Sequence, residues 1–109
     1  MFGKKRSELA ELDISHCTQL LSESREFLRM WTEPNGPATC LIDTQPVGAD
    51  PFAFGIALAD CVRHAAKAYT HATGILETEA EEQIWAGLDA ERASPTDSVT
   101  DLSDKGALN

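Results

Sequence analysis

Bulky apolar side chains are concentrated in two short segments near the middle of the chain. Residues 26–32 (EFLRMWT) and 39–44 (TCLIDT) have the composition of β-strands. Between them, Pro34 and Asn35 suit the second and third positions of a tight turn, because proline fixes φ and asparagine tolerates a positive φ. The pattern therefore predicts a β-hairpin.

A long helical pattern follows the hairpin, from Asp50 to Thr73. Asp50 is suited to cap free amide groups, Pro51 to occupy the first helical position, and Gly74 to end the helix. One broad face of the predicted helix is apolar and holds Phe54, Leu58, Cys61, Val62, Ala65, Ala66, Tyr69 and Ala72. The opposite face holds Asp60, Arg63, His64, Lys67 and His71. We expect the apolar face to pack against the hairpin and the polar face to lie in water.

Two further segments have helical spacing. In residues 7–21, Leu9, Leu12 and Leu20 fall on one side, which predicts an N-terminal helix. Residues 78–81 (TEAE) match a capping box for a last helix that ends near residue 92. The apolar stripe of this last helix consists of Ile84, Trp85 and Leu88.

The predicted order is helix, strand, strand, helix, helix, which indicates a small single α+β domain over residues 7–93. Residues 1–6 are expected to be a flexible N-terminal tip. Residues 94–109 are rich in Ser, Thr and Asp and are expected to be a disordered tail. A two-stranded ribbon packed on two or three helices keeps open edges and is marginally stable in water, so we predict a homodimer.

Charge and cysteine usage restrict the setting. The 109 residues carry a formal net charge of −9, and residues 77–91 hold six carboxylates and no basic residue. Nucleic acid and anionic membrane surfaces are therefore disfavoured as partners. The three cysteines, Cys17, Cys40 and Cys61, form no CxxC pair, and no apolar run follows the basic residues 4–6. We expect free, mostly buried thiols in a cytoplasmic protein.

The polar face of the long helix carries the most reactive side chains. Asp60 and His64 are one turn apart, which is suitable for a hydrogen bond, but Lys67 opposes a bound cation between His64 and His71. An ordinary solvated face explains the same residues. The chain has no GxSxG, P-loop, GxGxxG or HExxH motif, so no catalytic residue, metal site or cofactor is predicted.

Several of these residues belong to a recognisable pattern. The stretch E-F-L-R-M-W at residues 26–31, Asp50-Pro51, G-I-A-L-A-D-C-V-R-H at residues 55–64, and Ala68-Tyr69 together resemble the proteobacterial domain-of-unknown-function family 5076. The resemblance covers about residues 20–92 and implies a shared fold and a bacterial cytoplasmic setting. It assigns no activity. The matched motif positions include Glu26, Arg29, Trp31, Asp60, Arg63, His64 and Tyr69.

Three functions are compatible with these observations. The favoured one is a non-enzymatic, self-associating interaction or accessory module, which fits the open hairpin and the spare apolar surface. The alternative is a regulatory domain that binds a small molecule near Arg29, Arg63 and His64. The third is an enzyme that uses Asp60 and His64 as an acid–base pair. The candidate ligand-binding residues are Arg29, Trp31, Asp60, Arg63, His64 and Tyr69.

Overall fold

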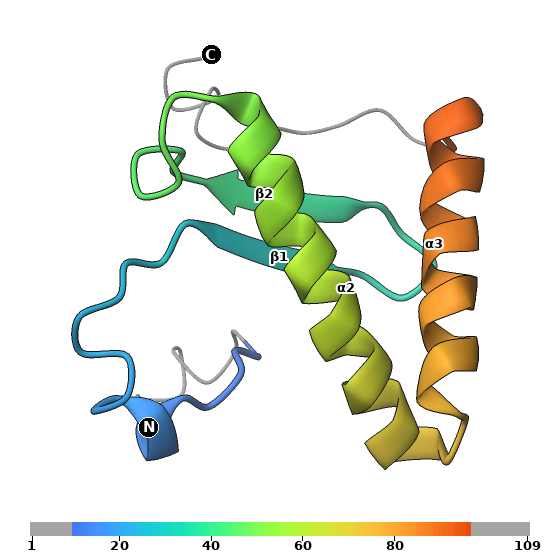
Figure 1. Cartoon of the computed structure of the whole chain (residues 1–109), viewed down its shortest axis with the longest axis horizontal. Helices are drawn as coiled ribbons and strands as arrows, with labels where there is room; N and C mark the ends of the chain where they lie inside the picture. The colour runs from blue at the N-terminus through green and yellow to red at the C-terminus, as the bar shows by residue number, and fades with distance from the viewer. Residues whose placement is uncertain (1–9, 97–109) are drawn as a thin grey trace.

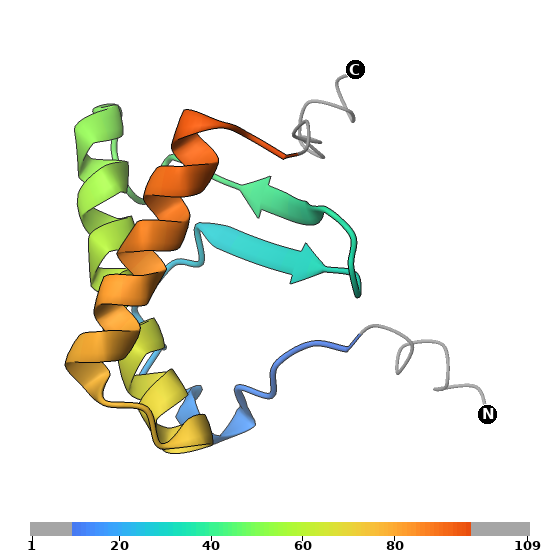
Figure 2. The ribbon, with the colours of Figure 1, turned by 90° about the vertical axis from the view of Figure 1, so that its right-hand side faces the viewer.

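A computed structural model describes residues 10–96 of the chain. It contains a single turn of 3₁₀ helix, η1 (Ser15–Cys17), two strands, β1 (Leu28–Thr32) and β2 (Ala38–Ile42), and two long helices, α2 (Pro51–Thr73) and α3 (Glu77–Ala93). The two helices form one layer and the hairpin lies to one side of it (Figures 1 and 2). The predicted α+β class, with a two-stranded hairpin and two helices, is confirmed.

The hairpin is antiparallel, and its register pairs Leu28 with Ile42 and Thr32 with Ala38. Its turn forms as the sequence predicts: the Gly36 amide donates to the Glu33 carbonyl at 2.9 Å. Asn35 has a φ of +60°, the conformation that this residue type tolerates better than most.

Helix α2 begins and ends at the predicted residues. The Asp50 side chain accepts a hydrogen bond from the Phe52 amide at 3.1 Å, and Pro51 occupies the first turn. At the other end Gly74 adopts a left-handed φ of +82°, and its amide donates to the Thr70 carbonyl. Both ends of the helix are therefore satisfied by local sequence.

Small side chains form the contact between the two helices. Val62 and Ala66 of α2 and Ala80 of α3 are buried, and Ala66 is fully inaccessible to solvent. Alanine allows two helix backbones to approach closely, and the short connection after Gly74 turns α3 back along α2 (Figure 1).

The hairpin is only loosely attached to this helical layer. No Cα atom of either strand lies within 8 Å of a Cα atom of α2 or α3. The aromatic contact joining the two layers is made by Phe27, just before β1, and Phe54 of α2, whose ring centroids are 5.8 Å apart and inclined at 81°. This edge-to-face geometry is favourable, but it is a small area of contact for a whole hairpin.

The predicted N-terminal helix is wrong for the part that the structure describes. Residues 10–14 are not helical, and only Ser15–Cys17 form a helical turn. The Asp13 side chain accepts a hydrogen bond from the Ser15 amide at 2.9 Å, which competes with helix formation. Leu12, expected on the packed stripe, is 92% exposed, so no burial compensates for this competition.

The predicted capping box of α3 is also wrong. The helix begins at Glu77 with Leu76 at the N-cap, and no side chain caps it. Thr78 therefore lies inside the first turn, where its hydroxyl is not in the capping position. Glu77 and Glu79 in this turn favourably face the positive end of the helix dipole.

The predicted N-terminal tip, residues 1–6, and most of the predicted tail, residues 97–109, lie outside the described residues. Within residues 10–96, neither helix has an apolar stretch of the length that a bilayer requires.

The left-handed conformation of Gly74 leads to a first prediction. Gly74→Ala places a Cβ in a strained conformation and should lower the free energy of unfolding by about 1–2 kcal/mol. Gly87→Ala is the matched control, because it lies inside α3 and an added Cβ meets no atom within 4 Å. The control should gain about 0.5–1 kcal/mol. Urea unfolding at one fixed protein concentration measures both, and equal effects would contradict the assigned role of Gly74.

The cap at Asp50 leads to a second prediction. Asp50→Ala removes the acceptor for the Phe52 amide and should cost about 1 kcal/mol of stability. Asp50→Asn keeps a side-chain oxygen and should retain most of the stability. Thermal or urea unfolding of the two variants tests the cap, and an alanine variant as stable as the asparagine variant would show that the cap contributes nothing.

Candidate interaction surface

Very little of one copy of the chain is buried. Val62, Ala66 and Ala80 are the buried hydrophobic residues of the described part. None of the leucine, isoleucine, phenylalanine or tryptophan side chains in residues 10–96 is buried. Large apolar side chains normally supply most of a domain core, so this distribution is unusual for a protein that folds alone.

The exposed apolar residues gather on four elements. Met30 is 62% exposed and Phe52 is 75% exposed. The set spans the N-terminal segment, the hairpin, α2 and α3, and consists of Leu12, Ile14, Leu20, Leu21, Met30, Leu41, Ile42, Phe52, Ile56, Leu58, Tyr69, Leu76, Trp85 and Leu88. Exposed apolar surface is a common feature of interaction sites, so these residues are candidates for such a site.

Both faces of the hairpin contribute to this surface. Paired residues in an antiparallel ladder point to the same face, so the register places Met30 with Cys40 and Leu28 with Ile42 on one face. The other face holds Arg29 with Leu41 and Trp31 with Thr39. No residue of either strand is buried, so neither face is fully covered by the chain's own helices.

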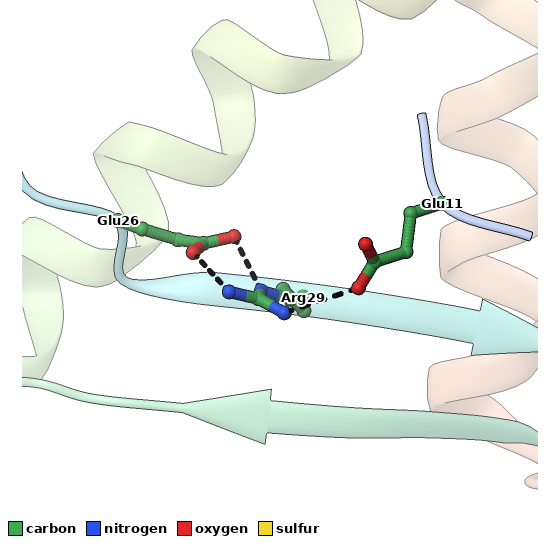
Figure 3. Close-up of polar contacts among 3 residues, drawn as sticks. All are labelled: Glu11, Glu26 and Arg29. Carbon is green, nitrogen blue, oxygen red and sulfur yellow. Dashed lines mark hydrogen bonds and ion pairs between the residues drawn. The ribbon is translucent and has the colours of Figure 1, made fainter. Parts of the chain in front are cut away.

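Arg29 of β1 forms an ion-pair cluster with Glu26 and Glu11. The Arg29 guanidinium donates from Nε and Nη2 to the two carboxylate oxygens of Glu26, at 2.7 and 2.8 Å, and its Nη1 is 3.5 Å from the Glu11 carboxylate (Figure 3). The fork geometry matches the bidentate pairing that arginine makes best. The cluster ties the N-terminal segment to β1.

This cluster changes the ionisation of its members. The hydrogen bond from Arg29, followed by its positive charge, lowers the pKa of the Glu26 carboxyl. The same hydrogen bond and the charges of Glu26 and Glu11 raise the pKa of Arg29. A carboxyl with a lowered pKa favours the folded state above its unfolded pKa and loses that contribution as the pH falls. Because about half of each side chain is exposed to water, solvent screens this contribution.

The six predicted ligand residues are divided between two elements. Arg29 and Trp31 lie on β1, whereas Asp60, Arg63, His64 and Tyr69 lie on α2. On α2 the Arg63 guanidinium donates to the Asp60 carboxylate, so Asp60 forms an ordinary ion pair with Arg63 and not a hydrogen bond with His64. Within residues 10–96, no hydrogen bond or ion pair joins the β1 residues to those on α2.

These ion pairs occupy the arginines that a small molecule would need. Arg29 is held by Glu26 and Glu11, and Arg63 by Asp60. His64 is exposed, and Tyr69, expected on the packed face, is 55% exposed. The small-molecule site near Arg29, Arg63 and His64 stays a prediction.

The cysteines are more accessible than expected. All three are free thiols; Cys17 and Cys40 are half-buried and Cys61 is exposed. The expectation that Cys61 is buried is wrong, because the hairpin does not cover this side of α2 closely. Among the described residues, no three His, Cys, Asp or Glu side chains gather closely enough to hold a metal ion.

Two open hollows flank the hairpin, each of about 350 Å³. One lies between the end of β2 and the start of α2, and is lined by Ile42, Val47 and Phe54 among others. The second lies between the N-terminal segment and β1, and is lined by Leu12, Ile14 and Met30 among others. Both are wide and largely apolar, as expected of grooves between loosely packed elements.

The comparisons with known proteins give a family and a similar solved structure. A solved structure from the photosynthetic bacterium Rhodopseudomonas palustrus, provisionally described as a pyruvate dehydrogenase, matches with a TM-score of 0.59 and 27% identity, over 84% of this chain and 92% of that one. That description is a statement about the relative. No curated protein matches the chain. The family model described as domain of unknown function (DUF5076) matches residues 13–96, and the chain therefore belongs to this family.

Proposed function

We propose that this protein is a non-enzymatic, self-associating interaction module whose stable form is a homodimer. The observation that carries the proposal is the contrast between three small or medium buried side chains and many exposed large ones in residues 10–96. A second copy supplies the apolar cover that one copy lacks. The proposed role is accessory: the dimer presents a surface to other proteins and carries out no reaction of its own.

The state of the hairpin supports this proposal. An isolated two-stranded ribbon is marginally stable in water, and three or more strands or a well-packed helical face are needed for independent stability. Within residues 10–96 the sheet has two strands, and the Phe27–Phe54 ring contact is one link between it and the helices. Association with a second copy would provide the missing support.

The charge distribution restricts where the second copy can bind. Helix α3 carries Glu77, Glu79, Glu81, Glu82, Asp89 and Glu91, and a second copy is equally acidic. Packing two such helices against each other would bring like charges together in a desolvated contact. The hairpin and the apolar start of α2, with Phe52 and Ile56, are the favourable surfaces.

Sedimentation equilibrium tests the proposal on the full chain. At micromolar concentration we expect a single species of twice the chain mass of 11.8 kDa. The unfolding midpoint should also rise with protein concentration, because unfolding and dissociation are coupled in a dimer that lacks a stable monomer.

A monomeric mass at micromolar concentration, with a midpoint that does not depend on concentration, would refute the homodimer. Gly87→Ala is a suitable control for this experiment. It changes stability on the acidic helix, away from the proposed contact, and should leave the mass unchanged.

A further inference from the structure

The outer edge of β2 is an unpaired strand edge. The sheet order is β1–β2, so each strand has one neighbour among the described residues and one free side. Figure 2 shows the hairpin extending away from the helical layer with its strands side by side. An unpaired edge of this kind is a template for pairing with another strand.

The ladder determines which backbone groups this edge offers. The Asp43 amide donates to the Phe27 carbonyl at 2.9 Å, which makes Phe27 and Asp43 a hydrogen-bonded pair in register with the hairpin. Hydrogen-bonded and non-hydrogen-bonded pairs alternate in an antiparallel ladder. Thr39 and Leu41 therefore direct their N–H and C=O groups toward β1. Ala38, Cys40 and Ile42 direct theirs outward.

The edge of β2 lacks the charged and proline residues by which many proteins block strand pairing. Residues 37–42 (PATCLI) carry no charge, and the one proline precedes the strand. Edge strands are commonly protected by charged side chains, bulges or a proline within the strand. β2 has neither a charge nor a proline between Ala38 and Ile42.

The edge of β1 differs from that of β2. Its central segment contains the charged Arg29, which contacts Glu11 of the N-terminal segment. Leu12 and Ile14 of this segment line a hollow together with Met30 of β1. The N-terminal segment therefore already lies beside β1 and competes with any incoming strand, whereas β2 contacts only β1 among the described strands and helices.

We infer that two copies of the chain join through their β2 edges, antiparallel, around a two-fold axis at Cys40. This inference rests on the proposed homodimer and specifies its contact. In this register Cys40 faces Cys40 of the second copy, and Ala38 faces Ile42. All three outward residues of each copy then donate one hydrogen bond and accept one. A shift of the register by two residues leaves one of these residues unpaired in each copy.

The resulting sheet has four strands in the order β1–β2–β2–β1. Four strands with apolar faces exceed the minimum for an independently stable sheet. Cys40 meets its counterpart across the axis on the face that it shares with Met30, whereas Met30 lies on the outer strand, about three strand spacings from its own counterpart. Pro37 lies opposite Asp43 of the second copy, so the register brings no like charges face to face.

Single-cysteine variants of the full chain test this register. In a hydrogen-bonded antiparallel pair the two Cα atoms are about 5.5 Å apart, which is within the span of a short bis-maleimide. The variant Cys17→Ala/Cys61→Ala retains only Cys40 and should form a covalent dimer in high yield. The matched control Cys17→Ala/Cys40→Ala retains only Cys61, which is exposed on α2, and should remain uncrosslinked.

A pair of proline variants tests which edge is used. Cys40→Pro removes an outward amide of β2 without removing a bond to β1, and each dimer loses two interstrand hydrogen bonds. Its dissociation constant should rise by about tenfold or more. Met30→Pro makes the same change at the outer edge of β1, because Met30 pairs with Cys40 in the ladder. It should leave the dimer intact, and circular dichroism checks that both variants are folded.

The outcomes separate this inference from the proposed function. A dimeric wild type whose Cys40-only variant does not crosslink would overturn the β2 contact and leave the homodimer standing. Dissociation by Met30→Pro to the same extent as by Cys40→Pro would also overturn it. A monomeric wild type at micromolar concentration would overturn both.

Discussion

The shortage of apolar burial within one copy is the constraint on which the rest of the structure depends. The interior of the described chain consists of Val62, Ala66 and Ala80. Burial of apolar surface is the main favourable term in folding, and it has to offset the conformational entropy lost when the chain becomes ordered. The two helices meet along small side chains, the hairpin lies beside them without close backbone contact, and many large side chains remain accessible.

The helical layer and the hairpin are stabilised in different ways. Helix α2 has a cap at Asp50, a glycine stop at Gly74 and a buried seam with α3, so it is defined by local sequence and by its partner helix. The hairpin has a well-formed turn, but its strands have no close backbone contact with either helix. The first part is a scaffold that one copy can form. In the proposed dimer the hairpin gains most from association, because its β2 edge is uncharged and unpaired within residues 10–96.

The sequence predicts the elements whose signals are local. Pro34 and Asn35 define the turn, and Asp50, Pro51 and Gly74 define α2, because each acts through its own backbone conformation or a neighbouring amide. The sequence-based prediction fails where contacts with a second element determine whether a residue is buried or helical. The spacing of Leu9, Leu12 and Leu20 predicts a helix, yet nothing covers Leu12, and the Asp13 side chain binds the Ser15 amide instead. Likewise Cys61 and Tyr69 were expected to be packed because they share a face with Val62. The helical periodicity does not specify how closely the hairpin approaches that face.

The partners of the charged residues also could not be predicted from the sequence. Arg29 could be singled out by its family pattern, but its pairing with Glu26 and Glu11 depends on how the N-terminal segment runs beside β1. Asp60 could be placed one turn from both Arg63 and His64, and only the coordinates show that Arg63 is the partner. The sequence shows that both faces of the hairpin carry apolar residues. It does not show how exposed they are, because their exposure depends on the distance between the hairpin and the helices.

Amide hydrogen exchange on the full chain measures the central claim most directly. The amides of Cys40 and Ile42 point away from β1, and those of Met30 and Thr32 point away from β2, so neither pair is protected by the hairpin itself. If a second copy completes the sheet through β2, Cys40 and Ile42 exchange slowly while Met30 and Thr32 exchange quickly, and the protection weakens on dilution. Fast exchange at all four amides, at every concentration, would contradict the account.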